Sequence, residues 1–159
     1  MTGPSLRVVG AVGLAALLLH VVLIQPNHPA AMTWAALPVL SLEWVVLLLA
    51  LPVIGDGRIG RVLRAILVLA LTVIAVLKLA DFAMFTSFTR GFNPVGDMPL
   101  IAAAFRLAWG SIGLLPTLAV LICGLLAIAG LAAGLWWAMG VVARVPLPRP
   151  ARPVAGAGA

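Results

Sequence analysis

Charged residues are scarce in this sequence, and acidic residues are the scarcest of them. Only 9% of the 159 residues are charged and only four are acidic, whereas 64% are hydrophobic. The mean hydropathy is +1.24. A water-soluble domain of this length exposes too much surface for its volume to bury so much apolar area. The composition therefore excludes an ordinary soluble domain and indicates an integral membrane protein.

Residues that could form a reactive centre are also few. The single cysteine, Cys123, excludes an intrachain disulfide and has no base near it in the sequence. His20 and His28 have no cysteine or carboxylate beside them at the spacing of metal ligands. There is no glycine-rich phosphate loop and no acid–base pair with a supporting domain. We therefore expect no catalytic, cofactor-binding or metal-binding residue in this chain.

Long apolar runs predict four membrane-spanning helices. A helix rises about 1.5 Å per residue, so about 20 apolar residues cross the hydrocarbon core, which is about 30 Å thick. The predicted spans are residues 8–24, 31–54, 62–82 and 112–142. We assign the last to one long, tilted helix, because the uncharged stretch 107–143 is too short for two spans and a turn. The predicted fold is all-α, with residues 1–144 as the transmembrane domain.

Arginines mark the ends of these runs and predict their orientation. Two of them, Arg90 and Arg106, fall on one side, and seven fall on the other: Arg7, Arg58, Arg61, Arg64, Arg144, Arg149 and Arg152. Since basic residues accumulate on the cytoplasmic side, both termini are predicted to lie in the cytoplasm, as in a multi-pass protein of the inner membrane. The net charge of +6 does not indicate nucleic acid as a partner, because the arginines flank apolar runs and do not form a solvated face.

Residues 83–111 are predicted to form an external segment that holds the more specific side chains. All five phenylalanines lie between Lys78 and Gly113. Asp97 is expected to cap a short interfacial helix of residues 98–109, with Gly110 at its C-terminal end. The segment would be either a docking platform for headgroups or a partner domain, or a connector that only follows the bilayer boundary. Its candidate contact residues are Asp81, Arg90, Asn93, Asp97 and Arg106.

Glu43 and Lys78 are predicted to lie inside the second and third spans. Charges at membrane depth are costly, so they usually face protein or water and are often functional. Antiparallel packing of the two spans would bring these side chains within reach, and we treat them as a candidate intramembrane polar pair. The two residues would form either a proton or ion relay or a structural ion pair, or Glu43 would be protonated and hydrogen-bond a neighbouring helix. Asp81 lies one helical turn after Lys78, which predicts a local ion pair between them.

Two further features concern association and the C-terminal end. Gly130 and Gly134 form a G-x-x-x-G motif that permits close approach of helices and makes self-association a hypothesis. Residues 145–159 contain several prolines, which favour an extended linker. The small apolar residues 154–159 follow three arginines and predict the first turns of an outward fifth span.

Three segments resemble a known family: QPNHPAAMTW at 25–34, LKLADFAMFTSFTRGFNPVGDMPLI at 77–101, and Gly110 to Gly113. They are similar to the N-terminal membrane region of bacterial sulfatase-like hydrolases of the alkaline phosphatase superfamily. Membrane-bound phosphoethanolamine transferases and lipoteichoic-acid (phosphoglycerol-transferring) synthases share the general plan. The resemblance implies an external catalytic domain that follows the membrane region, with a metal-bound Thr, Ser or formylglycine nucleophile and Asp and His ligands.

None of those catalytic residues has a counterpart here, because the chain has no Cys-x-Pro-x-Arg signature. The resemblance therefore implies a membrane anchor or platform that is not catalytic by itself, with the lipid bilayer and a downstream enzyme domain as partners. An external domain requires an odd number of spans, which the expected fifth span would restore. The alternative is a self-contained small four-helix membrane protein, such as a transporter subunit or a scaffold.

Overall fold

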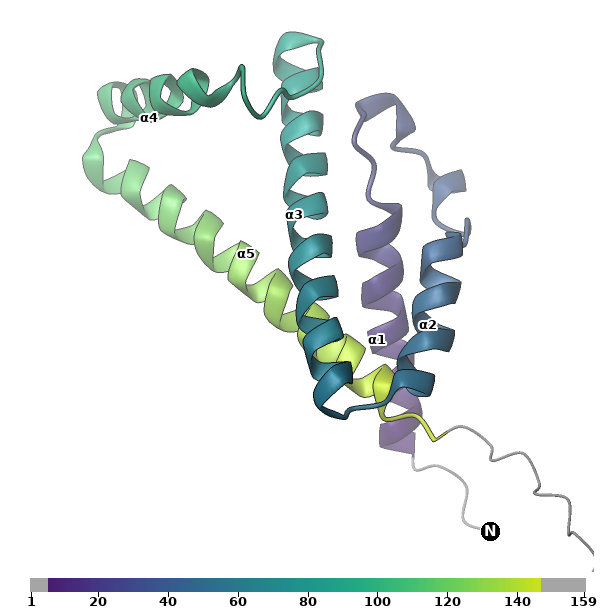
Figure 1. The fold of residues 1–159 in the computed structure, drawn as a ribbon. Coiled ribbons are helices and arrows are strands. Elements are labelled where there is room, and N and C mark those ends of the chain that lie inside the picture. The colour runs from purple at the N-terminus through teal and green to yellow at the C-terminus, as the bar shows by residue number, and fades with distance from the viewer. Residues whose placement is uncertain (1–5, 147–159) are drawn as a thin grey trace, which may run out of the picture.

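The computed structural model describes residues 6–146, and over these residues the protein is all-helical (Figure 1). The α-helices are α1 (Leu6–Ile24), α2 (Leu42–Ile54), α3 (Arg58–Phe88), α4 (Met98–Ile112) and α5 (Leu114–Ala143). Two short 3-10 helices, Pro29–Ala31 and Trp34–Ala36, lie between α1 and α2. The predictions for Arg149, Arg152 and the start of a fifth span concern residues outside the described range.

The helices form a bundle that is tight at one end and open at the other (Figure 1). The start of α1, the α2–α3 turn and the end of α5 lie together at one end, which we call the Asp56 end. At the opposite end α4 lies crosswise to α3, and we call this the α4 end. From α4 the chain returns diagonally along α5, so α3, α4 and α5 enclose a wedge.

Three helices are long and apolar enough to cross a membrane: α1 with 19 residues, α3 with 31 and α5 with 30. This is the pattern of an integral membrane protein. Four full-length spans are not confirmed, because the α-helix within the predicted span 31–54 begins only at Leu42. The Ser41 hydroxyl accepts a hydrogen bond from the Trp44 amide and caps the helix there. At 13 residues, α2 is about 20 Å long, which is shorter than the hydrocarbon core.

The ends of α3 and α4 also differ from the predictions. α3 continues past residue 82 to Phe88 and ends at Thr89, which has a left-handed φ of 56°. Asp97 occupies the N-cap position of α4, but its side chain makes no capping hydrogen bond, because other groups bind its carboxylate. Gly110 lies inside α4, and the helix ends instead at Gly113. The φ of +87° at Gly113 suits glycine and redirects the chain into α5.

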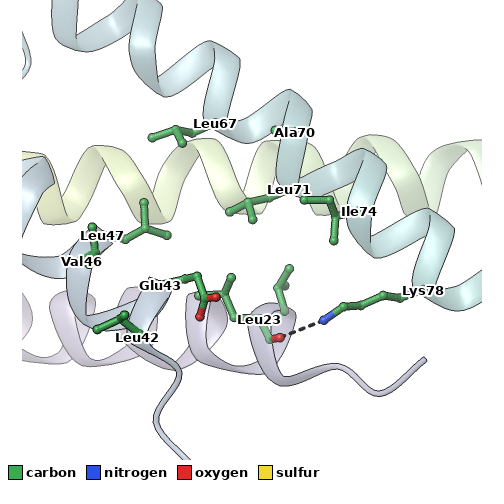
Figure 2. A pocket seen from close by; sticks show the side chains of 11 residues that line it. Leu23, Leu42, Glu43, Val46, Leu47, Leu67, Ala70, Leu71, Ile74 and Lys78 are labelled. Atoms are coloured by element: carbon green, nitrogen blue, oxygen red, sulfur yellow. Dashed lines mark hydrogen bonds between the residues drawn. The ribbon is translucent and has the colours of Figure 1, made fainter. Parts of the chain in front are cut away.

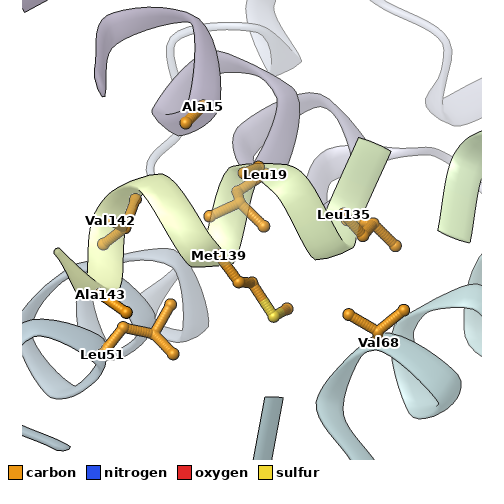
Figure 3. Close-up of a cluster of buried hydrophobic side chains, with 9 residues drawn as sticks. Ala15, Leu19, Leu51, Val68, Leu135, Met139, Val142 and Ala143 are labelled. Carbon is orange, nitrogen blue, oxygen red and sulfur yellow. The ribbon is translucent and has the colours of Figure 1, made fainter. Parts of the chain in front are cut away.

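The buried core lies near the Asp56 end, where all the long helices meet (Figure 3). Leu19 of α1 and Leu135 and Met139 of α5 are fully buried there. Val68 of α3 and Leu51 of α2 close the cluster. Along α5, by contrast, residues 118–130 are all exposed. The C-terminal part of α5 is therefore held by core packing, whereas its N-terminal part lies apart from α3.

Candidate functional site

A cavity of about 530 Å³ lies between α1, α2 and α3, and it contains the two charges predicted to pair (Figure 2). Glu43 enters it from the first turn of α2, and Lys78 enters it from α3. The remaining lining residues are aliphatic, among them Leu47 and Leu71. The cavity therefore places one acid and one base in otherwise apolar surroundings.

Glu43 and Lys78 share this cavity but form no ion pair with each other. The Lys78 Nζ donates a hydrogen bond to the carbonyl oxygen of Leu23 at 3.0 Å (Figure 2). Among the described residues, no hydrogen bond or ion pair holds the Glu43 carboxylate. Leu23 lies in the last turn of α1, where carbonyl groups lack helical partners and the helix dipole is negative. Glu43 lies at the positive N-terminal end of α2, so a helix end stabilises each charge separately.

At the α4 end, Arg90 and Asp97 form a bidentate ion pair. The Arg90 Nη1 lies 2.9 Å from Oδ2 of Asp97, and Nη2 lies 2.5 Å from Oδ1. The Asp97 side chain is only 5% exposed and also accepts the Asn93 amide at 2.8 Å. The hydrogen bond from Arg90 is the main cause that lowers the pKa of Asp97, and the bond from the Asn93 amide lowers it further. The same bond to Asp97 raises the pKa of Arg90. The pair therefore remains charged across the physiological range.

Other predicted contact residues close the same loop. The Asn93 side-chain oxygen accepts the amides of Val95 and Gly96, both at 3.1 Å. Asp81 accepts the Phe92 amide at 2.8 Å and joins α3 to the loop. The predicted ion pair between Asp81 and Lys78 is therefore wrong, because each finds a backbone partner elsewhere. Arg106 lies exposed on α4 and forms no ion pair within residues 6–146.

A third polar cluster, at the Asp56 end, was not predicted as a site. Asp56 pairs with Arg64 at 3.0 Å and with Arg144 at 2.9 Å. The hydrogen bond from Arg144 is the main cause that lowers the pKa of Asp56. Arg64 has a side chain only 5% exposed and stacks over the Trp136 ring, with 4.0 Å to its centroid. The one sequence signal was that Asp56 is the only acid in a basic turn.

The other candidates have simple positions. The His20 Nε2 lies 2.8 Å from the Leu37 carbonyl, and the His28 Nδ1 accepts the Ala30 amide. Cys123 is exposed on α5. In the part of the chain that the structure describes, no three His, Cys, Asp or Glu side chains gather as a metal site would require.

The G-x-x-x-G motif is partly used within the chain itself. A side chain at Gly134 would lie 3.3 Å from the Leu18 methyl group, so Gly134 allows α5 to approach α1 closely. Gly130 has nothing within 4 Å of the same point. One half of the motif thus serves internal packing, and only Gly130 presents an open surface.

Comparison of the chain with protein-family models, with curated proteins and with solved structures finds no match. The resemblance to sulfatase-like enzymes therefore rests on the quoted segments alone.

Proposed function

We propose that this chain is a membrane anchor and platform, non-catalytic by itself, for a sulfatase-like or phosphoglycerol- or phosphoethanolamine-transferase-like domain outside the inner membrane. The observation that supports this most is the network of polar contacts that orders the loop at the α4 end. The Arg90–Asp97 pair and the Asp81–Phe92 bond hold the loop before α4 against α3. Ordering a backbone residue costs about 1–2 kcal/mol, so a loop with this many fixed polar contacts suits a surface that must keep its shape.

The proposed platform has a defined exposed surface. Val95 is 86% exposed at the tip of the loop, and Trp109 and Ile101 are exposed along α4. Helix-to-helix connections in bundles usually take about 2–8 residues. Residues 89–113 far exceed that length and include a whole helix. Contact between this surface and an enzyme domain would explain why the connection between α3 and α5 is so long.

The topology that we propose has four crossings within the described residues, with both described ends in the cytoplasm. A fifth crossing after them would then lead to the external domain. The supporting observation is that the start of α1 and the end of α5 lie at the same end (Figure 1). Arg64 and Arg144 meet there at Asp56. Arg90 and Arg106 belong to the opposite end, as the rule for basic residues requires. α2 and the connector before it would together complete the second, shortened crossing.

Labelling of single cysteines tests this topology. In a Cys123→Ala background, we expect a membrane-impermeant maleimide to label the Val95→Cys variant in intact spheroplasts. The matched Gly57→Cys variant should react only after lysis. Labelling of both variants, or of Gly57→Cys alone, would exclude the proposed orientation.

Cross-linking tests the platform itself. A photo-reactive amino acid in place of Val95 should capture a domain with sulfatase-like sequence, identified by mass spectrometry of the adduct. The control position is Leu69, which is 67% exposed in the middle of α3 and should capture only lipid. Lipid adducts alone at both positions would count against the enzyme-platform proposal and leave the topology unaffected.

The cavity supports a second candidate, a self-contained transporter subunit or scaffold. Its supporting observation is that Glu43, an exposed residue, lines the otherwise aliphatic cavity beside Lys78 and has no ion-pair partner among the described residues. A relay that uses this carboxylate predicts proton flux in vesicles that Glu43→Gln abolishes. The platform proposal predicts no such flux in either protein.

A further inference from the structure

The cavity between α1, α2 and α3 holds two charged side chains whose polar groups the protein satisfies only in part (Figure 2). An ammonium group has three hydrogen-bond donors, and the Leu23 carbonyl accepts one of those of Lys78. Within residues 6–146 no other group accepts a hydrogen bond from the Lys78 Nζ, and none donates one to the Glu43 carboxylate. Two ammonium donors and a whole carboxylate therefore need another partner.

A hydrogen bond to α1 places the start of α2 at hydrocarbon depth. α1 has 19 residues and is about 28 Å long, which is close to the thickness of the hydrocarbon core. The Trp44 Nε1 donates to the carbonyl oxygen of Ala16 at 2.8 Å, and Ala16 lies two helical turns before the end of α1 at Ile24. Glu43 directly precedes Trp44, so this turn of α2 lies about 12 Å below the end of α1.

The backbone at this depth also has groups without partners, where the connector meets α2. The carbonyl oxygens of Val39 and Leu40 accept no hydrogen bond from a described residue. The amides of Leu42 and Glu43, at the start of α2, find no acceptor among those residues either. Non-helical backbone occurs at membrane depth only where protein covers it or water reaches it. Since Val39 and Leu40 are both exposed, residues 6–146 do not supply the cover.

Water in the cavity would satisfy these groups. A volume of about 530 Å³ is ample for water, which takes about 30 Å³ per molecule in the liquid and enters cavities that offer it polar partners. Lys78 offers such partners level with the last turn of α1, and Glu43 offers them deeper in the bundle. Toward the Asp56 end, Leu47 and Leu67 of the lining pack against the buried core, which closes that side.

We propose that this cavity is a water-filled inlet, open toward the α4 end and closed toward the Asp56 end, which makes the Glu43 carboxylate accessible to water at hydrocarbon depth. Water hydrates each charge separately, so neither needs the other as a partner. The inference goes beyond the proposed platform function, since it requires no enzyme domain. It requires no proton flux either, because the core separates the inlet from the Asp56 end. Failure of the cross-linking and flux tests above would leave it standing.

Two neighbouring cysteine positions on α3 test the inlet. Ile74 lines the cavity and is 47% exposed, whereas Val73 is 48% exposed and does not line it. In a Cys123→Ala background, Ile74→Cys should react with the impermeant maleimide at least about tenfold faster than Val73→Cys, because the reactive thiolate forms only where water reaches it. Reaction should occur from the same side of the membrane as for Val95→Cys. Equal rates, or reaction of Ile74→Cys only from the opposite side, would overturn the proposal.

The wild-type protein gives a second test that needs no cysteine. A membrane-impermeant quaternary carbodiimide and glycinamide are applied to the side of the membrane on which Val95→Cys reacts, and the purified chain is mapped by mass spectrometry. We expect Glu43 to be converted to its amide with glycinamide, and Glu43→Gln to show no modification at this position. Modification of Glu43 only by dicyclohexylcarbodiimide, which partitions into hydrocarbon, or by neither reagent, would mean that lipid or a partner chain covers the carboxylate. Either result would overturn the inlet.

Discussion

Arg64 should contribute more to stability than any other arginine at the Asp56 end. Its guanidinium lies between Asp56 and the Trp136 ring, and its side chain is almost wholly buried. A desolvated cation over an indole face is worth about 2 kcal/mol. Arg64→Met removes this stacking and one of the two partners of Asp56. We therefore expect the free energy of unfolding to fall by about 2 kcal/mol or more.

The assay is reversible unfolding in mixed micelles by titration with SDS, followed by circular dichroism. Arg61→Met is the matched control, because Arg61 is an exposed neighbour on the same helix whose side chain makes no hydrogen bond among the described residues. Its effect should stay within about 0.5 kcal/mol. Arg64→Lys keeps the charge but loses the planar stacking group, so it should fall between the two. Equal effects of Arg64→Met and Arg61→Met would refute the assigned role of the Trp136 contact.

Three further predictions concern a turn, a loop and the cavity. Gly60→Ala places a methyl group against the Gly55 carbonyl oxygen and should destabilise the protein in the same SDS titration. In the control Gly10→Ala the added methyl group meets open space, and the higher helix propensity of alanine should stabilise the protein by up to about 1 kcal/mol. Because the pKa of Asp97 is lowered in the folded protein, its ionised carboxylate stabilises the folded loop at any pH above the ordinary carboxyl pKa of about 3.9. This stabilisation is lost as the pH falls through the lowered pKa of the folded state. The protection factors of the α4-loop amides, which are exchange rates corrected for the intrinsic effect of pH, should therefore be unchanged between pH 7 and 5 and fall only below about pH 4. Lower protection factors already at pH 5 would contradict this. A double-mutant cycle of Glu43→Gln and Lys78→Met should give a coupling below about 0.5 kcal/mol, and a coupling well above 1 kcal/mol would indicate a direct ion pair.

Much of the fold follows from hydropathy, because an uncharged run of helical length has few other stable arrangements in a bilayer. This explains why α1, α3 and α5 lie close to the predicted spans. The prediction of residues 31–54 exceeded the true helix because the run contains no charge before Glu43 to signal an interruption. The capping hydroxyl of Ser41 decides where α2 begins. A single serine inside an apolar run is a weak signal, and Ser or Thr also occurs within helices.

The polar clusters were predictable only where their members are close in sequence. Arg90 and Asp97 are seven residues apart, and both were candidates for the external segment. Arg144 and Asp56 are 88 residues apart, and their ion pair depends on where the diagonal α5 ends. The ion pair predicted between Asp81 and Lys78 was equally local, yet Asp81 accepts the Phe92 amide instead, because the chain turns back at Thr89. Contacts of this kind depend on backbone direction, which hydropathy does not encode.

The separation of Glu43 from Lys78 has a physical reason that applies to charges in membranes generally. An ion pair in apolar surroundings must offset the desolvation of two charges with one contact, and often does so poorly. A helix end offers a partial charge and unsatisfied backbone groups that need a partner in any case. Lys78 therefore satisfies a carbonyl that α1 would otherwise leave without a helical partner, and Glu43 lies in the first turn of α2. Two charges of opposite sign that line one cavity are thus each associated with a helix end here, and not with each other.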